Sequence, residues 1–310
     1  MKITILAFNF GPTRSFTNGP GMSLYVFCKA ISREFDIDLF TDLKPEVNIP
    51  GVSFFSSKDS ASFKRSIKSS YAIHHWSGIT KNLQKLMRYV SNKKIILGPN
   101  LFDCVEIDKE REYLNHIDLF KVLSVNDRIK YNICFNHDIH HQNVKTFIVG
   151  PDEDHWFPGK ITEKFILWKG NSNHRAKDIG FALKLKNKLN QYNFKLIGYP
   201  NPYNYMSHID IAKKSYLYVN TSISETKSQT LMESWASGVP SVTHPKIYLH
   251  GINYETGIIT NKTLDDYSEA IIEIMENKIL RKRLSEGALS YIFNNFSKES
   301  LISDYKSILL

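Results

Sequence analysis

Short runs of apolar residues alternate along the chain with longer segments in which apolar residues recur every three or four positions. The short runs predict buried strands and the periodic segments predict helices. Such alternation is typical of α/β proteins, in which helices connect parallel strands. Strands are expected over 3–8, 37–40, 52–55, 71–74, 95–97, 122–124, 146–149, 165–168, 194–197, 216–219, 241–243 and 257–259, with helices such as 23–31, 79–89, 180–189 and 264–275.

The pattern is interrupted once, near the middle of the chain. Gly150-Pro151 and Pro158-Gly159 lie close together, and the strand pattern starts again at Phe165. A chain of 310 residues is long enough for two domains. We therefore expect one domain over 1–149, a second over 150–297, and a terminal amphipathic helix over about 298–310 that packs back on the first.

Composition indicates the cellular compartment of the protein and the chemical classes of partner that it could bind. The formal net charge of +9 favours anionic partners such as nucleotide phosphates, lipid headgroups, acidic glycans or nucleic acid, although a lysine-rich solvated surface explains it equally well. The three cysteines show no CxxC spacing, which argues against a zinc knuckle and a disulfide scaffold. Neither a signal peptide nor a membrane-spanning run is expected, so we predict a cytoplasmic protein without an integral span.

The most informative segment covers residues 224–240. A strand enters a loop with Glu225, and a helix is expected to begin near Ser228. Free N–H groups at Ser228, Gln229 and Thr230, together with the helix dipole, would receive a phosphate. Glu233 lies further along this helix, so the two glutamates can accept hydrogen bonds from hydroxyls on different parts of one extended ligand.

Here the sequence resembles a known family. Two glutamates separated by seven residues and followed by Ala-x-Gly-Val-Pro are similar to the signature of retaining GT-B glycosyltransferases of the family 4 type. The resemblance implies that Glu225 contacts the donor sugar and that Glu233 binds the ribose. It also implies two facing Rossmann-like domains with a deep cleft between them. The N-terminal domain would hold the acceptor, and the C-terminal domain a UDP- or GDP-linked sugar donor, with neither cofactor nor metal.

A second match lies in the first strand of the C-terminal half and the basic residues after it. Gly170 corresponds to the family's turn glycine, and Lys177 to its phosphate-binding lysine. Two positions depart from the family pattern, because Asn171 replaces the usual arginine and Asp178 replaces the usual glycine. We expect Arg175 to supply the missing positive charge. A third match is the stretch 147–158, whose Phe-Pro end resembles the family's interdomain segment.

The N-terminal half resembles the family in layout alone. Glycines at 11, 19 and 21 follow the first strand, and Gly21 is expected to let the backbone approach the donor, although a surface loop would look the same. His75, or its neighbour His74, follows the strand over 71–74 and corresponds to a histidine near the acceptor; a structural histidine is about equally consistent. The histidines within 136–141 fit no tetrahedral metal set.

Several functions remain open from the sequence. The resemblance favours transfer of a sugar to a hydroxyl of a glycan or lipid-linked saccharide, with peripheral membrane association as an option. A phage-type enzyme that modifies a hydroxylated base in DNA would also suit the positive charge. A nucleotide-sugar epimerase and a non-catalytic nucleotide-sugar-binding protein would share the same fold.

Overall fold

The chain forms two compact units. A computed structural model describes residues 1–8, 19–77, 94–100, 120–124, 144–161, 163–200, 205–223, 225, 227–247, 249 and 251–310. The first unit is built from Met1–Arg14, Asn18–Val149 and Leu301–Leu310, and the second mainly from Gly150–Ser300. The expected helix over 79–89 and the histidines within 136–141 lie outside the described residues.

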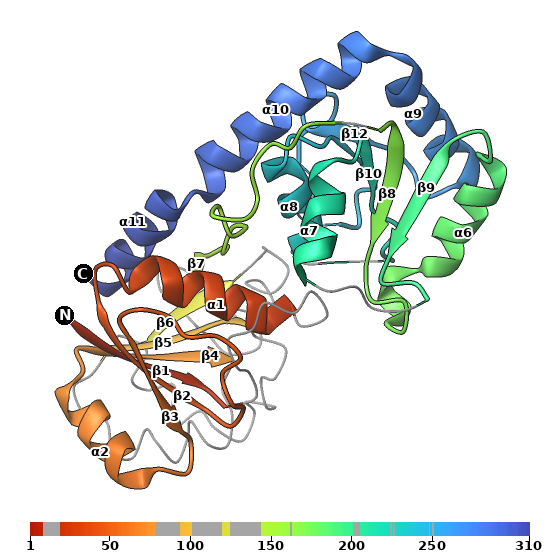
Figure 1. Ribbon diagram of the computed structural model, residues 1–310. Helices are drawn as coiled ribbons and strands as arrows, with labels where there is room; N and C mark the ends of the chain where they lie inside the picture. The colour runs from red at the N-terminus through yellow and green to blue at the C-terminus, as the bar shows by residue number, and fades with distance from the viewer. Residues whose placement is uncertain are drawn as a thin grey trace. The chain divides into compact units, whose positions relative to one another are not determined.

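Within its described residues, the first unit contains a parallel sheet of seven strands in the order β3-β2-β1-β4-β5-β6-β7 (Figure 1). Ile3, Ile5 and Leu6 of the central strand β1 are fully buried, as expected for a parallel strand covered on both faces. From β1 the chain first adds β2 and β3 on one side of the sheet. It then returns to the other side of β1 and adds β4, β5, β6 and β7, so the strand order reverses between β1 and β4. The strands are β1 (Lys2–Ala7), β2 (Asp36–Thr41), β3 (Val52–Ser56), β4 (Ala72–Ser77), β5 (Lys94–Asn100), β6 (Phe120–Ser124) and β7 (Val144–Thr146).

An aromatic cluster holds the end of the chain within this unit. Phe27 of α1 (Gly19–Ile31) packs edge-on against Tyr305 of α11 (Lys298–Leu309), with 5.0 Å between ring centroids. His74 Nε2 lies 2.6 Å from the carbonyl oxygen of Gly98, and its Nδ1 lies 3.1 Å from the Tyr305 hydroxyl. Because a carbonyl can only accept, Nε2 carries the proton and Nδ1 accepts from Tyr305. His74 is therefore a core residue.

The second unit contains a parallel sheet of five strands, counted over its described residues, in the order β12-β11-β10-β8-β9. The chain passes from β8 to β9 in one direction and then returns to β10 on the other side of β8. Helices α6 and α9 lie side by side, and α8 packs against α10 (Figure 1). The strands are β8 (Phe165–Lys169), β9 (Asn193–Ile197), β10 (Leu217–Val219), β11 (Ser241–Thr243) and β12 (Gly257–Ile259); the helices are α6 (Ile179–Lys188), α7 (Tyr205–Lys213), α8 (Gln229–Ala236), α9 (Leu264–Glu276) and α10 (Lys278–Phe296).

The helix α9 illustrates why these segments fold as they do. Thr263 caps its first turn by accepting a hydrogen bond from the Asp266 amide at 3.1 Å, and acidic residues in that turn complement the helix dipole. Tyr267, Ile271 and Ile274 recur at helical spacing and are fully buried. They join the apolar core between the helices and the sheet.

Several element boundaries differ from the sequence prediction, and two of these differences have a clear structural basis. The helix α1 begins at Gly19 rather than at residue 23, because proline is tolerated in the first turn, where its missing N–H costs nothing. The strand β7 ends at Thr146, so the apolar residues Phe147 and Val149 are buried outside any strand.

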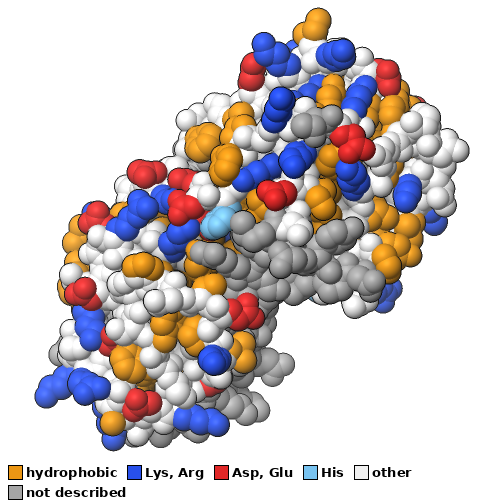
Figure 2. Space-filling view, in the orientation of Figure 1, with side chains coloured by type: hydrophobic (Ala, Val, Ile, Leu, Met, Phe, Trp, Pro, Cys, Tyr) orange, Lys and Arg blue, Asp and Glu red, His pale blue; other side chains and the backbone are white. Residues whose placement is uncertain are grey.

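On the face of the molecule shown in Figure 2, Lys and Arg side chains are interspersed with Asp and Glu over the described surface.

Candidate donor-binding site

The candidate site lies where the strand order of the second unit reverses. The strands β8 and β10 are neighbours, with Leu217 beside Ile166 and Tyr218 beside Leu167. In open parallel sheets, ligands bind beyond the carboxyl ends of the strands at such a reversal. The segments that leave these two strands, 170–178 and 220–225, contain five of the predicted site residues. The sheet topology therefore brings together two motifs that are far apart in the sequence.

Glu225 lies in the segment after β10 and is paired with a lysine. Its Oε1 atom accepts hydrogen bonds from Lys177 Nζ and, at 2.5 Å, from Ser222 Oγ. Its Oε2 atom is buried and accepts no hydrogen bond from any residue that the structure describes. Burial opposes ionisation of Glu225, but the positive charge of Lys177 and hydrogen bonds from Lys177 and neighbouring serine side chains together outweigh it and lower the pKa of this carboxyl. Glu225 is thus an ionised carboxylate with one oxygen unused.

A small hydrogen-bond network holds Lys177 in place. Lys177 ends the short helix η4 (Arg175–Lys177). Thr221, just after β10, accepts a hydrogen bond from the Trp168 indole at 2.8 Å and donates to the Lys177 carbonyl at 3.0 Å. The Ile223 amide donates to the Ala176 carbonyl at 2.7 Å. The backbone around Lys177 is therefore fixed to the same loop that carries Glu225.

Glu233 forms a second pair, deeper in the unit. It lies on α8, is 4% exposed, and its Oε2 atom contacts Nζ of Lys169, which is 3% exposed. The Lys169 ammonium also lies 4.5 Å from the centre of the Trp156 ring. Burial raises the pKa of Glu233 and lowers that of Lys169, and the attraction between the two charges opposes both shifts.

Lys169 is a site residue that the sequence analysis missed. The structure extends β8 to Lys169, whereas the sequence pattern predicted a strand that ends at Trp168 and gave Lys169 no role. Lysine is almost never fully buried unless it is paired. A lysine that directly follows a predicted buried strand was therefore a signal that a carboxylate could lie opposite it.

The beginning of α8 lacks a side-chain cap. Ser228 is its N-cap residue and is fully buried, but its side chain makes no capping hydrogen bond to the helix. The Ser228 hydroxyl instead accepts from the Asn220 amide at 3.0 Å, while the Thr230 hydroxyl lies 2.7 Å from the Tyr218 hydroxyl. The Gln229 amide nitrogen lies 3.5 Å from the Gly150 carbonyl. The N-cap side chain thus does not cap the first turn, in which the Leu231 amide donates to the Ser228 carbonyl at 3.1 Å.

The turn after β8 explains two unusual positions. Gly170 is buried, and a Cβ atom there would lie 3.2 Å from the Trp168 ring and 3.4 Å from Cγ of Lys177. Asp178 adopts a left-handed backbone with φ of 50°, which accounts for glycine at this position in the resembled family. Aspartate tolerates this conformation and here caps α6 by accepting from the Phe181 amide at 3.2 Å. Asn171 accepts from the Asn173 amide at 3.0 Å within the turn.

The remaining predicted residues make none of the contacts described above. Arg175 is exposed on η4. Gly21 is buried in the first turn of α1, in the first unit. His75 is buried in β4 of that unit, with its ring centroid 5.8 Å from that of Phe8. The roles assigned to Gly21 and His75 stay predictions.

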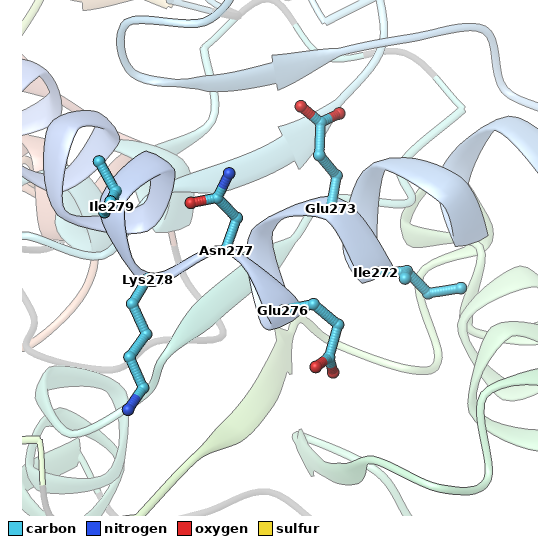
Figure 3. A pocket seen from close by; sticks show the side chains of 6 residues that line it. All are labelled: Ile272, Glu273, Glu276, Asn277, Lys278 and Ile279. Carbon is cyan, nitrogen blue, oxygen red and sulfur yellow. The ribbon is translucent and has the colours of Figure 1, made fainter.

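An open depression on the second unit lies elsewhere, at the junction of α9 and α10 (Figure 3). Its lining contains none of the predicted site residues. Within the described part of the chain, no three acidic, histidine or cysteine side chains gather as metal ligands do. The same residues include no helix that is both apolar and long enough to cross a membrane. The lining residues are Ile272, Glu273, Glu276, Asn277, Lys278 and Ile279.

Comparison with known proteins supports the fold. No protein-family model matches the sequence, and no curated protein matches it either. Among solved structures, a glycosyltransferase from Rickettsia africae is similar, with 13% identity and a TM-score of 0.78 over 99% of this chain and 97% of that one.

Two further similar structures were solved with nucleotides. HepE from Anabaena, in complex with UDP and glucose, has 12% identity and a TM-score of 0.71 over 100% of this chain and 99% of its own. An α-glucosyltransferase, in complex with UDP and a 13-mer DNA containing an HMU base, has 10% identity and a TM-score of 0.67 over the same shares. Together with the two parallel sheets, these similarities show that the chain has the GT-B fold expected from its sequence.

Proposed function

We propose that this protein transfers a sugar from a UDP- or GDP-linked donor to a hydroxyl group of an acceptor, with retention of the anomeric configuration. The observation that carries the proposal is the arrangement at the reversal point of the second sheet. There, two lysine–glutamate pairs, Lys177–Glu225 and Lys169–Glu233, lie beyond β8 and β10 near the first turn of α8. This is a suitable arrangement for a ligand with both hydroxyls and phosphates.

The diphosphate would bind between Lys177 and the beginning of α8. Lys177 is about a quarter exposed, so a phosphate can reach its ammonium and compete with Glu225 for it. The first-turn N–H groups at Ser228, Gln229 and Thr230 supply further donors. Arg175 is exposed nearby in sequence and adds charge for the outer phosphate. These groups would stabilise the charge that grows on the leaving diphosphate without a metal.

The two glutamates would hold the two sugars of the donor. Glu225 has one buried oxygen that accepts no hydrogen bond from the described residues, and transfer of Lys177 to the phosphate would release the other. Both oxygens would then accept hydrogen bonds from hydroxyls of the transferred sugar. Glu233 lies further along α8 and would accept from the ribose. Gly170 and Asn171 line the turn beside Lys177 and would let the donor approach the backbone closely.

The chemical step exchanges one bond at the anomeric carbon. The bond from this carbon to the phosphate oxygen breaks, and the electron pair leaves with the nucleoside diphosphate. The acceptor oxygen forms a bond to the same carbon from the same face, and its proton passes to the released phosphate oxygen. An oxocarbenium-like sugar develops between the two events, and the negative charge of Glu225 stabilises it electrostatically.

For the acceptor, we favour a glycan or lipid-linked saccharide. A base in DNA is a second candidate, because the α-glucosyltransferase with the same fold was solved with DNA and this chain has a net charge of +9. On the face shown in Figure 2, however, basic side chains are interspersed with acidic ones instead of forming a continuous stripe. Acceptor binding that weakens steeply with added salt would favour DNA over a neutral saccharide.

A thermal-shift screen tests the proposal. UDP, GDP and their sugar conjugates are added to the protein in excess chelator. A nucleotide at 100 times its Kd should stabilise the protein by about 2.7 kcal/mol. NMR of the released or transferred sugar then gives the anomeric configuration. The proposal fails if no nucleoside diphosphate or nucleotide sugar stabilises the folded protein.

A further inference from the structure

A buried charge ends the strand β8. The other residues of β8, Phe165–Trp168, are apolar and buried, and the Lys169 side chain is 2% exposed. A buried ammonium is costly unless a partner compensates it. Lys169 has two compensating contacts: the carboxylate of Glu233 and the face of Trp156. These contacts come from three segments of the second unit, so the position of the ammonium is tightly defined.

The pair also defines the position of Glu233. Lys169 binds the Oε2 atom of the carboxylate, so Oε1 is the oxygen that Lys169 does not use. Two other polar groups lower the pKa of Glu233: Gln229, one turn earlier on α8, and Lys227, in the loop before this helix. The positive charge of Lys177 in turn lowers the pKa of Lys169.

Of the two lysines near Glu233, Lys169 is the stronger partner. It has both the larger electrostatic effect on Glu233 and a direct hydrogen bond to it. Burial lowers the pKa of Lys227 to about 7, so this side chain is only partly charged near neutral pH. Without Lys169, burial would therefore favour the protonated form of Glu233.

We propose that Lys169 is a positioning residue for donor recognition: it keeps Glu233 ionised and directs its second oxygen toward a ribose hydroxyl. The inference rests on the proposed function, because it requires a nucleotide at this site. A protonated or rotated Glu233 would be a poor acceptor for that hydroxyl. Lys169 would thus control the preference for a ribonucleotide without contacting the nucleotide itself.

The experiment compares Lys169→Met with the wild-type protein. Calorimetry measures the affinities for UDP and GDP and for their 2′-deoxy and 3′-deoxy forms. The wild-type protein should prefer the ribonucleotide by about tenfold or more, as expected for a hydrogen bond to a charged group. Lys169→Met should lose most of this preference at neutral pH. The preference should return as the pH is raised, because Glu233 then ionises without its partner.

Three further variants separate positioning from folding. Lys177→Met makes the same change in the other pair; it should weaken ribo- and deoxynucleotides equally and leave their ratio unchanged. If Lys169→Met does not fold, the double variant Lys169→Met/Glu233→Gln removes both buried charges and should fold. It should show little ribonucleotide preference at any pH, while Lys169→Arg should retain the preference.

The outcomes are distinct. A folded Lys169→Met protein with the wild-type preference at neutral pH would overturn the inference and leave the proposed function intact. A double variant that keeps the full preference would overturn it in the same way. A wild-type protein that binds neither UDP nor GDP would overturn the proposed function and this inference together.

Discussion

Replacing Glu225 with glutamine is the sharpest test of the proposed chemistry. Glutamine keeps the size of the side chain and one acceptor oxygen, so the hydrogen bond from Ser222 can persist. The change removes the negative charge beside the developing oxocarbenium ion. We expect Glu225→Gln to reduce turnover far more than it reduces affinity for the free nucleotide.

The expected loss in turnover and the expected loss in folding stability differ in size. Loss of one electrostatic stabiliser typically costs about 2.7 to 4 kcal/mol in the transition state, which corresponds to a reduction in turnover of about a hundredfold or more. The cost in folding should be smaller, because the Lys177 side chain is 26% exposed. A partly buried ion pair contributes roughly 1 to 2 kcal/mol to the free energy of unfolding. This corresponds to about 2 to 8 °C in Tm for a domain of this size.

The assay is slow hydrolysis of the donor sugar, which requires no knowledge of the acceptor. Steady-state rates are measured with the nucleotide sugar that the thermal-shift screen identifies. Calorimetry with the corresponding nucleoside diphosphate gives the affinity, and a melting curve establishes that the variant is folded. Glu233→Gln is the matched control, because it makes the same change at the glutamate assigned to the ribose.

The expected contrast is a large loss in kcat for Glu225→Gln and a larger loss in nucleotide affinity for Glu233→Gln. If folded Glu225→Gln hydrolyses the donor at the wild-type rate, Glu225 does not act on the transferred sugar. The assignment of the two glutamates, and with it the proposed mechanism, would then have to be abandoned.

Three further predictions address binding and stability. Glu233→Ala should weaken UDP or GDP binding more than Glu225→Ala, and equal losses by calorimetry would contradict the division between ribose and sugar. Nucleotide binding should be unchanged in excess chelator, because Lys177 and the first turn of α8 supply the positive charge; loss of binding on metal removal would refute this. Burial lowers the pKa of His74 to about 3, so between about pH 6.5 and pH 3 the unfolded chain binds a proton that the folded chain does not. Stability should therefore fall by up to about 1.4 kcal/mol per pH unit as the pH decreases through this window, and melting curves of His74→Gln should show a shallower dependence than the wild type.

The sequence was sufficient to predict most of the elements. Apolar runs matched the buried strands, including β11 and β12 at their observed bounds, and helical spacing matched α9 to within one residue. These features are local, because side-chain periodicity and capping residues act within a few positions of the chain. The same local logic identified Glu225 and Glu233 by their spacing and by the Gly-Val-Pro that follows the helix.

Only the tertiary structure determined how these residues are paired. Lys177 and Glu225 are 48 positions apart, and Lys169 and Glu233 are 64 positions apart. Their contacts follow from the strand order β10-β8-β9, which places the ends of two non-consecutive strands side by side. No periodicity within a segment specifies that order, so Lys169 had no visible role in the sequence.

The ionisation of the site was likewise beyond the sequence. Glu225 and Glu233 have the same side chain, yet the pKa of the first is lowered and that of the second is raised. The difference arises because burial favours the neutral form of each carboxyl, whereas nearby ammonium groups and hydrogen bonds favour the charged form to different extents. The sequence specified which acids are present; their depth in the fold and the lysines packed against them determined how strongly each one holds its proton.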